Sequence, residues 1–208
     1  MSAFSFFFSF YGLLLGLCVA ELVGGLARTL HERKRVHFGW LTPALALFVA
    51  IDIATFWNQA WIFFRGAPYN MFLLLLGLVI ASTFYIAASI TFPKLSQAET
   101  QHIDLDQHFW EQRRTIFSCI LAANLIVVTL ILCLASANAE FARVASSARL
   151  WIGLAIFVAG TATAGFAKNR LVAKIALICV LAYSLWGVWN SLSMLITAGG
   201  WAPAFTVE

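Results

Sequence analysis

Two carboxylic acids, Glu21 and Asp52, lie within long apolar segments of the 208-residue chain, and no lysine or arginine lies deep in either segment. An ionisable side chain inside a membrane costs about 2.5 to 3.5 kcal/mol on insertion scales, so it usually serves a purpose there. Such an acid can hold and release a proton, bind a cation, or join two helices through a hydrogen bond. For Glu21, an ion pair with Arg28 is a further interpretation, because the side chain of an arginine near a helix end can extend along the helix to reach it.

Other polar residues share the depth of these acids. Helical spacing puts Asp52, Thr55 and Gln59 on one face of a single helix, and we expect that face to point away from lipid. Further polar residues near the middle or outer half of other apolar segments are Asn124, Tyr85 and Asn190. Together they predict a polar interior centred on Asp52, with Glu21 nearer the cytoplasm.

The elements that must position these residues are membrane-spanning helices. Hydrophobic residues make up 62% of the chain and charged residues only 11%, far from the composition of water-soluble domains. Six apolar runs are each long enough to cross a bilayer. They cover residues 4–27, 40–64, 71–92, 115–135, 148–167 and 171–196. We therefore expect an all-α integral membrane protein in which residues 1–208 form one compact six-helix bundle.

The basic residues are divided unequally between the two ends of these runs. Ten of the thirteen lie on one side: Arg28, Arg33, Lys34, Arg35, Lys94, Arg113, Arg114, Lys168, Arg170 and Lys174. Only Arg65, Arg143 and Arg149 lie on the other. The positive-inside rule then predicts cytoplasmic loops after the first, third and fifth runs, and both termini outside the cytoplasm. This pattern accounts for the net charge of +4 without nucleic acid.

Small residues recur at every fourth position in two of the runs. The ladders are Gly12, Gly16, Ala20 and Gly24 in the first run, and Ala155, Ala159, Thr163 and Ala167 in the fifth. Such ladders allow close helix packing in lipid, either within one chain or between subunits, and we expect a homo-oligomer. The aromatic residues of segment 4–11 are typical of an anchor at the headgroup boundary, and a wide aromatic pocket for an apolar ligand is the alternative.

The longest predicted loop, residues 93–114, and the histidines define the expected cytoplasmic side. Residues 96–99 have the pattern of a capping box, and Asp104 to Asp106 predict a helix start that continues into the fourth span. Four histidines, His31, His37, His102 and His108, are weak candidates for a metal site between two loops. Their spacing matches no familiar ligand signature, and the sequence holds no hydrolase, nucleotide-binding or dinucleotide motif. We expect no catalytic residues and no cofactor.

Several short features resemble a broad set of bacterial six-span membrane proteins with no assigned activity. They are Glu21-Leu22 with Gly25 to Arg28, the basic first loop, Trp57 in the second run, Phe92-Pro93, and Arg113-Arg114. The resemblance covers most of the chain and implies a bacterial inner (cytoplasmic) membrane, but no substrate.

Three functions are compatible with the sequence. The first is transport or channel-like passage of a proton, small cation or small solute through the interior around Asp52. The second is a non-enzymatic sensor or partner subunit that docks another protein through its cytoplasmic loops. The third is a membrane-embedded enzyme acting on a lipid or quinone.

Overall fold

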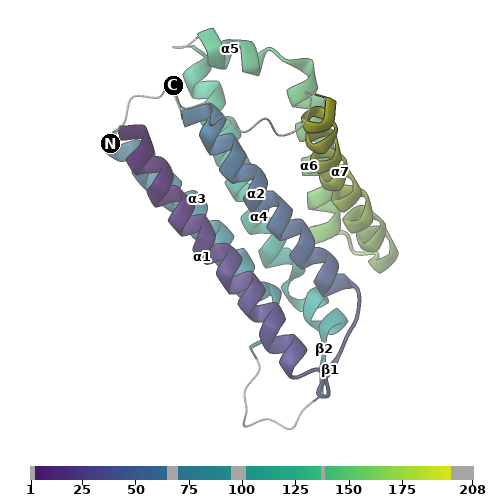
Figure 1. Cartoon of the computed structure of the whole chain (residues 1–208). Coiled ribbons are helices and arrows are strands. Elements are labelled where there is room, and N and C mark those ends of the chain that lie inside the picture. Colours follow the sequence, from purple (N-terminus) through teal and green to yellow (C-terminus); the bar gives the residue numbers. More distant parts are fainter. Residues whose placement is uncertain (1–2, 65–69, 95–101, 137–138, 198–208) are drawn as a thin grey trace.

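The computed structural model describes residues 3–64, 70–94, 102–136 and 139–197. Almost all of these residues are in helices (Figure 1). The elements in chain order are α1 (Ala3–His31), β1 (Val36–His37), α2 (Leu41–Phe64), α3 (Met71–Thr91), β2 (Ile103–Asp104), α4 (Leu105–Ala135), α5 (Ala139–Ala145), α6 (Ala148–Phe166) and α7 (Arg170–Thr197). Among the described residues, six helices are long and apolar enough to cross a membrane: α1, α2, α3, α4, α6 and α7. The chain is therefore an all-α, multi-pass membrane protein.

The helix boundaries follow local sequence. Asn70 caps α3 by accepting a hydrogen bond from the backbone N–H of Leu73, at 2.9 Å. Helix α3 ends at Thr91 because Pro93 favours extended backbone at Phe92, which has φ −108° and ψ 145°. Helix α4 begins at Leu105, as the sequence predicts, and continues without a break into the fourth span. The predicted capping box at residues 96–99 lies outside the described residues, and the short helix α5 and the two strands were not predicted.

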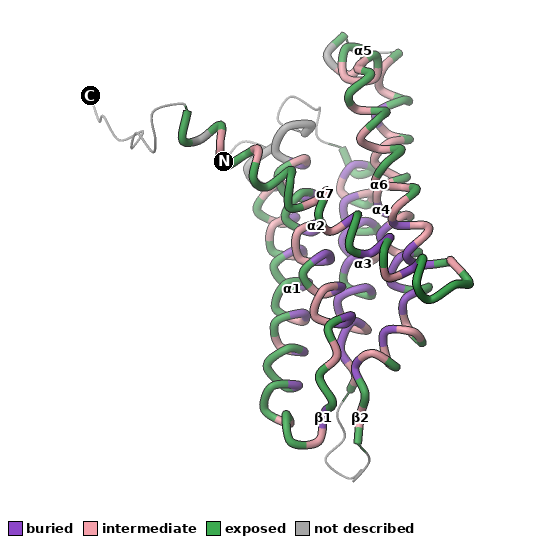
Figure 2. Tube along the Cα trace, turned by 90° about the vertical axis from the view of Figure 1, so that its right-hand side faces the viewer, coloured by how far each residue is buried: buried purple, intermediate pink, exposed green. Residues whose placement is uncertain are grey.

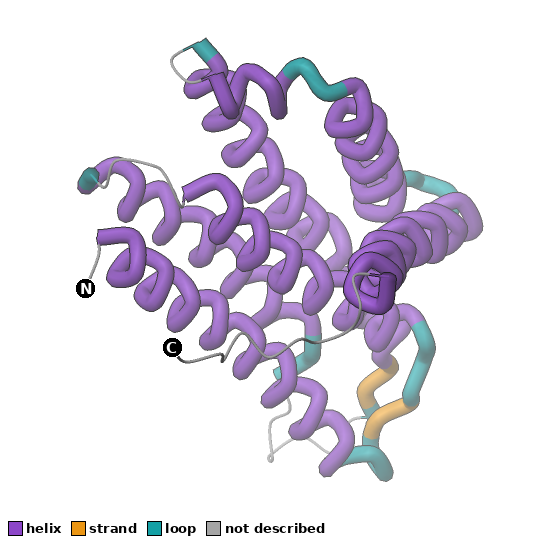
Figure 3. Tube along the Cα trace, turned by 45° about the horizontal axis from the view of Figure 1, so that its top comes forward, coloured by secondary structure: helices purple, strands orange, loops and turns teal. Residues whose placement is uncertain are grey.

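The six long helices form two layers of three (Figures 1 and 3). One layer contains α1, α2 and α7, and the other contains α3, α4 and α6. Across the layers α1 packs on α3, α2 on α4, and α7 on α6. The α2–α4 pair therefore occupies the centre, which is where Asp52 and Asn124 lie.

The bundle has a buried apolar core, as a soluble protein has, but its exposed surface is also apolar. Buried residues line the helix sides that face one another, while the outward sides are exposed (Figure 2). Large apolar side chains are common outside: Met71 is 67% exposed, Leu13 65% and Ile152 61%. A continuous apolar exterior of this kind is suited to lipid.

Close helix packing within the chain depends on one glycine of the predicted ladders and on others outside them. A Cβ added at Gly12 of α1 would lie 3.2 Å from Trp57 of α2, and one at Gly165 of α6, outside the ladders, would lie 2.8 Å from Phe117 of α4. In contrast, a Cβ at Gly16 would have no heavy atom within 4 Å, and Ala20 and Ala159 are exposed. Much of the small-residue surface of both ladders thus faces outward from the single chain.

The loops after α1 and α3 are joined at one end of the bundle. Strands β1 and β2 pair in parallel, with Val36 opposite Ile103 and His37 opposite Asp104. Asp104 caps α4, since its Oδ1 accepts hydrogen bonds from the backbone N–H groups of Asp106 and Gln107. The loop after α6 lies at the same end, so the three basic segments identified in the sequence share one end of the molecule (Figure 1).

Arg113 joins α4 to the end of α6. Its guanidinium donates hydrogen bonds to the carbonyl oxygens of Ala164, at 2.9 Å, and Ala167, at 2.7 Å. The last carbonyls of a helix have no partner within the helix, so a buried arginine that binds two of them caps it. Arg113 was predicted only as one of the basic residues of a loop, whereas it is 6% exposed and is part of the packing.

Candidate functional site

Asp52 and Asn124 meet between the two central helices. The Asp52 side chain projects from the middle of α2 toward α4 and is only 5% exposed. Asn124 Nδ2 donates a hydrogen bond to Asp52 Oδ2, at 3.4 Å, and another to the backbone carbonyl of Ile120, at 3.0 Å. Among the described residues no lysine, arginine or histidine forms an ion pair with this carboxyl group. The acid predicted to be buried and unpaired therefore has an amide, and not a cation, as its partner.

Aromatic rings lie one helical turn from Asp52 on both sides. Toward the basic end, Phe48 contacts Phe117 of α4 and Phe157 of α6, with ring centroids 6.0 and 5.9 Å apart. Toward the opposite end, Phe56 meets Phe84 of α3 edge to face, at 4.6 Å. Because Phe48, Phe56 and Phe84 are buried, the carboxyl group lies in a mainly apolar layer.

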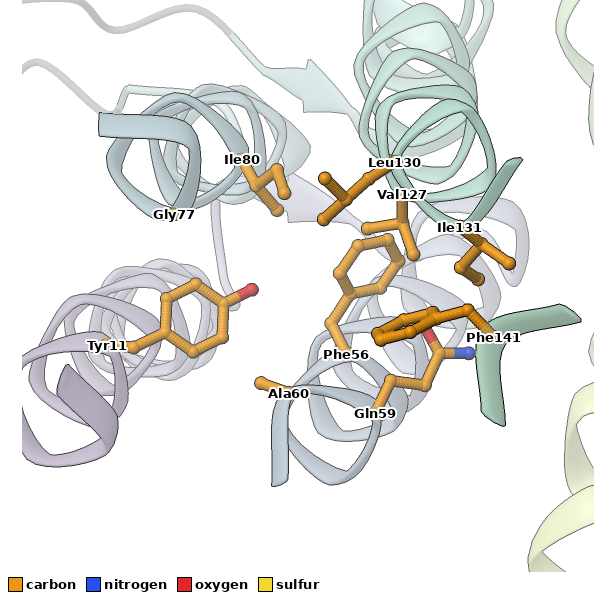
Figure 4. A pocket seen from close by; sticks show the side chains of 10 residues that line it. All are labelled: Tyr11, Phe56, Gln59, Ala60, Gly77, Ile80, Val127, Leu130, Ile131 and Phe141. Atoms are coloured by element: carbon orange, nitrogen blue, oxygen red, sulfur yellow. The ribbon is translucent and has the colours of Figure 1, made fainter. Parts of the chain in front are cut away.

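A small cavity adjoins this layer on the side of Phe56 (Figure 4). Its volume is about 20 Å³, enough for roughly one water molecule. Two polar side chains reach it, Tyr11 from α1 and Gln59 from α2, and the rest of the lining is mainly apolar. Asp52 does not line the cavity itself, but Phe56 does and lies one turn from it.

Tyr11 is a site residue that the sequence interpretation missed. Its aromatic segment suggests a headgroup anchor, but Tyr11 is 3% exposed and its ring stacks on Phe7, with centroids 5.9 Å apart. Figure 4 shows its hydroxyl group pointing away from α1 toward Ile80 and Phe56. The signal was the spacing: Phe7, Tyr11, Leu15 and Cys18 recur at helical intervals and all are buried.

The remaining predicted site residues are not gathered around Asp52. Thr55 is exposed, and its hydroxyl group donates to the carbonyl of Ile51 in its own helix, at 2.9 Å. Thr55 therefore lies outside the buried core of the single chain, where a threonine can satisfy its hydroxyl group one turn back. The expectation that the whole Asp52, Thr55 and Gln59 face avoids lipid stays a prediction. Tyr85 is 46% exposed, and Asn190 is half-buried on α7. In the described part of the chain neither forms a hydrogen bond with Asp52 or Asn124.

Glu21 forms the ion pair that the sequence allowed. Its Oε1 lies 3.0 Å from Nη2 of Arg28, two turns along α1, and both side chains are partly exposed. Glu21 does not line the cavity described above.

The four histidines do not meet at one point. His31, His37 and His102 are exposed, while Nε2 of His108 lies 3.0 Å from the carbonyl oxygen of Ile90. Within the described residues, no three histidine, cysteine or acidic side chains are grouped so that they could hold a metal ion.

Comparison of the chain with models of known protein families, with curated proteins and with solved structures found no match. The chemistry of the site must therefore be inferred from its own geometry. A carboxyl group held by one amide, between aromatic rings and close to space for one water molecule, can hold and exchange a proton.

Proposed function

We propose that the chain is a membrane protein that binds and passes a proton at Asp52. The observation that carries this proposal is the buried Asp52 carboxyl group in the middle of α2, whose hydrogen-bond partner is the amide of Asn124. A carboxyl group buried at this depth costs free energy whether its role is structural or functional. Its presence therefore favours a function in which the acid itself takes part.

The orientation of Asn124 favours a proton over a metal cation. Its Nδ2 must face the Ile120 carbonyl, which accepts hydrogen bonds only, so the second N–H of the same nitrogen is the one directed at Asp52. An N–H donor is a poor neighbour for a bound cation, which requires several oxygen ligands. A proton on the other carboxyl oxygen requires no further ligand.

The adjoining cavity gives a route of suitable size on one side. Space of about 20 Å³ admits one water molecule but no hydrated ion or organic solute. Tyr11 and Gln59 supply the polar groups that such a water molecule needs. Movement of the Phe56 ring would connect this water molecule with Asp52, which lies one helical turn from Phe56 toward the basic end.

The proposed setting is a bacterial inner membrane, with the basic end of the bundle in the cytoplasm and both termini outside it. The asymmetric distribution of lysine and arginine supports this orientation. The cavity beside Phe56 then lies on the outer side of Asp52.

Proton flux into proteoliposomes tests the proposal directly. Wild-type protein should acidify the lumen faster than protein-free vesicles under an imposed potential, and Asp52→Asn should remove the difference. Glu21→Gln is the matched control, because it neutralises the other membrane acid and should leave the flux unchanged. A folded Asp52→Asn protein with wild-type flux, or wild-type flux equal to that of empty vesicles, would refute the proposal.

A homo-oligomer is the second part of the proposal, supported by the exposed small residues. Gly16 has open space where a Cβ would stand, and Ala20, Ala155 and Ala159 are exposed, so α1 and α6 offer surfaces for close helix contact. Docking of another protein at the loop before α4 has less support, because Asp104 and Asp106 are occupied in capping helices. Crosslinking in native membranes distinguishes a second copy from a different partner.

A further inference from the structure

Two arginines from different helices share one tryptophan ring at the basic end of the bundle. The guanidinium carbon of Arg113 lies 4.8 Å from the centroid of the Trp110 ring, and that of Arg170 lies 5.2 Å from it. The two guanidinium carbons are therefore no more than 10.0 Å apart, the sum of these distances. Because Trp110 and Arg113 belong to α4 and Arg170 begins α7, packing of the helices holds the two like charges together.

No acid among the described residues neutralises this pair. The ion pairs among the described residues join Arg28 to Glu21 and Arg35 to Glu32. Arg113 binds only carbonyl oxygens, and the nearest acid along α4, Glu111, accepts a hydrogen bond from Gln107. Two adjacent cations without an acidic partner repel each other, and an anion bound at the exposed Arg170 would relieve the repulsion.

The surroundings indicate the class of anion. Arg170 is exposed, and apolar side chains beside it also point outward, since Phe166 is 47%, Leu171 64% and Ile175 52% exposed. A lipid whose headgroup binds the arginines would lay its acyl chains along these side chains. A soluble anion would leave them uncovered.

We propose that the exposed Arg170 on the Trp110 ring, with the positive charge of the buried Arg113 behind it, forms a binding site for the phosphate group of an anionic phospholipid. Guanidinium groups suit this ligand because their planar N–H donors match phosphate oxygens, and basic residues between spanning helices bind anionic headgroups. The site is distinct from Asp52 and does not depend on its proposed role.

Native mass spectrometry of the full chain in a neutral detergent, with added phosphatidylglycerol or phosphatidylcholine, tests the site. Arg170→Gln is the variant of choice, because Arg170 is exposed whereas Arg113 caps α6. Arg33→Gln is the matched control, since Arg33 is an exposed arginine at the same end and remote from Trp110 in sequence. We expect Arg170→Gln to weaken phosphatidylglycerol binding about fivefold and Arg33→Gln to leave it near the wild-type value.

Competition with inorganic phosphate identifies the source of the anion. Millimolar phosphate should not displace phosphatidylglycerol if the acyl chains contribute to binding, and phosphatidylcholine should bind equally to wild type and variant. Displacement by phosphate alone would overturn the lipid assignment in favour of a soluble phosphate compound. Equal phosphatidylglycerol binding by wild type, Arg170→Gln and Arg33→Gln would overturn the site.

Discussion

Asp106, in the first turn of α4, caps α2 across the bundle by accepting a hydrogen bond from the backbone N–H of Leu41, at 3.1 Å. Thr42, the next residue, donates from its hydroxyl group to the carbonyl oxygen of Leu105, at 2.6 Å. The N–H groups at the start of a helix have no partner within it, so α4 supplies a partner that α2 lacks by itself. This contact fixes the relative position of the two helices that bring Asp52 and Asn124 together.

Asp106→Ala should lower the free energy of unfolding by about 1 kcal/mol, the typical effect of losing an N-cap side chain. Unfolding by sodium dodecyl sulfate in mixed micelles, followed by far-ultraviolet circular dichroism, measures this change. Glu111→Ala is the control, because Glu111 lies further along the same helix, is exposed and bonds only Gln107 among the described residues. Equal stability of Asp106→Ala and wild type would show that the cap contributes nothing.

Gly39→Ala should disturb the same contact from the other side. A Cβ added at Gly39 would overlap the Asp106 carboxylate, which must then move away from Leu41. The substitution should therefore destabilise the wild type but have a much smaller effect in an Asp106→Ala background. A double-mutant cycle on unfolding free energies measures the coupling, and additive effects would contradict it.

Arg113→Gln should destabilise the protein more strongly than any change of an exposed arginine. It breaks two hydrogen bonds from a charged group and leaves the Ala164 carbonyl buried without that donor, with an expected loss of about 3 kcal/mol. Arg113→Lys should not restore stability, because a single ammonium group does not reproduce the planar fork of guanidinium donors.

Arg114→Gln provides the comparison for Arg113→Gln, since Arg114 is the next residue, carries the same charge and is exposed. Thermal melting in neutral detergent should show a lower melting temperature for Arg113→Gln and little change for Arg114→Gln. Similar melting temperatures for the two variants would mean that the α4–α6 link is not required for stability.

The proposed orientation is testable with single cysteines at the two ends of the bundle. In a background with all four native cysteines, Cys18, Cys119, Cys133 and Cys179, replaced by alanine, Arg149→Cys should react with a membrane-impermeant maleimide added to intact spheroplasts. Lys34→Cys should react only after lysis. Both positions are exposed; Arg149 is in the first turn of α6 and Lys34 lies just before β1, and these elements begin at opposite ends of the structure (Figure 1). The reverse labelling pattern would mean that the basic end faces outward.

Much of the fold could be predicted from the sequence, because the length of an apolar run is enough to indicate a membrane-spanning helix. The spans and the start of α4 at Asp104 to Leu105 depend on local patterns, hydrophobicity and capping, and these were predictable. The β1–β2 pair, the Asp106 cap and the Arg113 link were not, since each joins segments at least 51 residues apart. Asp106 and Arg113 look like ordinary loop charges in the sequence, because the segments that they contact are distant along the chain.

The candidate site shows the same division. Asp52 was identifiable because a carboxyl group is unusual in an apolar run. Asn124 was identifiable because an amide is also unusual there. Which polar residues face them depends on helix rotation and neighbours, so Gln59 reaches the cavity whereas Thr55, Tyr85 and Glu21 do not. Tyr11 was missed because its phenylalanine-rich segment has the composition of an interfacial anchor.

Tyr11→Phe should slow proton flux several-fold without abolishing it. The Tyr11 hydroxyl group is one of the two polar groups that reach the cavity next to Phe56, so removing it leaves a water molecule there with fewer hydrogen-bond partners. The ring packing on Phe7 and Gly77 is retained, so stability should hardly change. Tyr85→Phe is the matched control, because it removes a hydroxyl group from an exposed tyrosine on the neighbouring helix. Initial rates of lumen acidification in proteoliposomes separate the two variants, and an equal effect of both would dissociate the cavity from the path to Asp52.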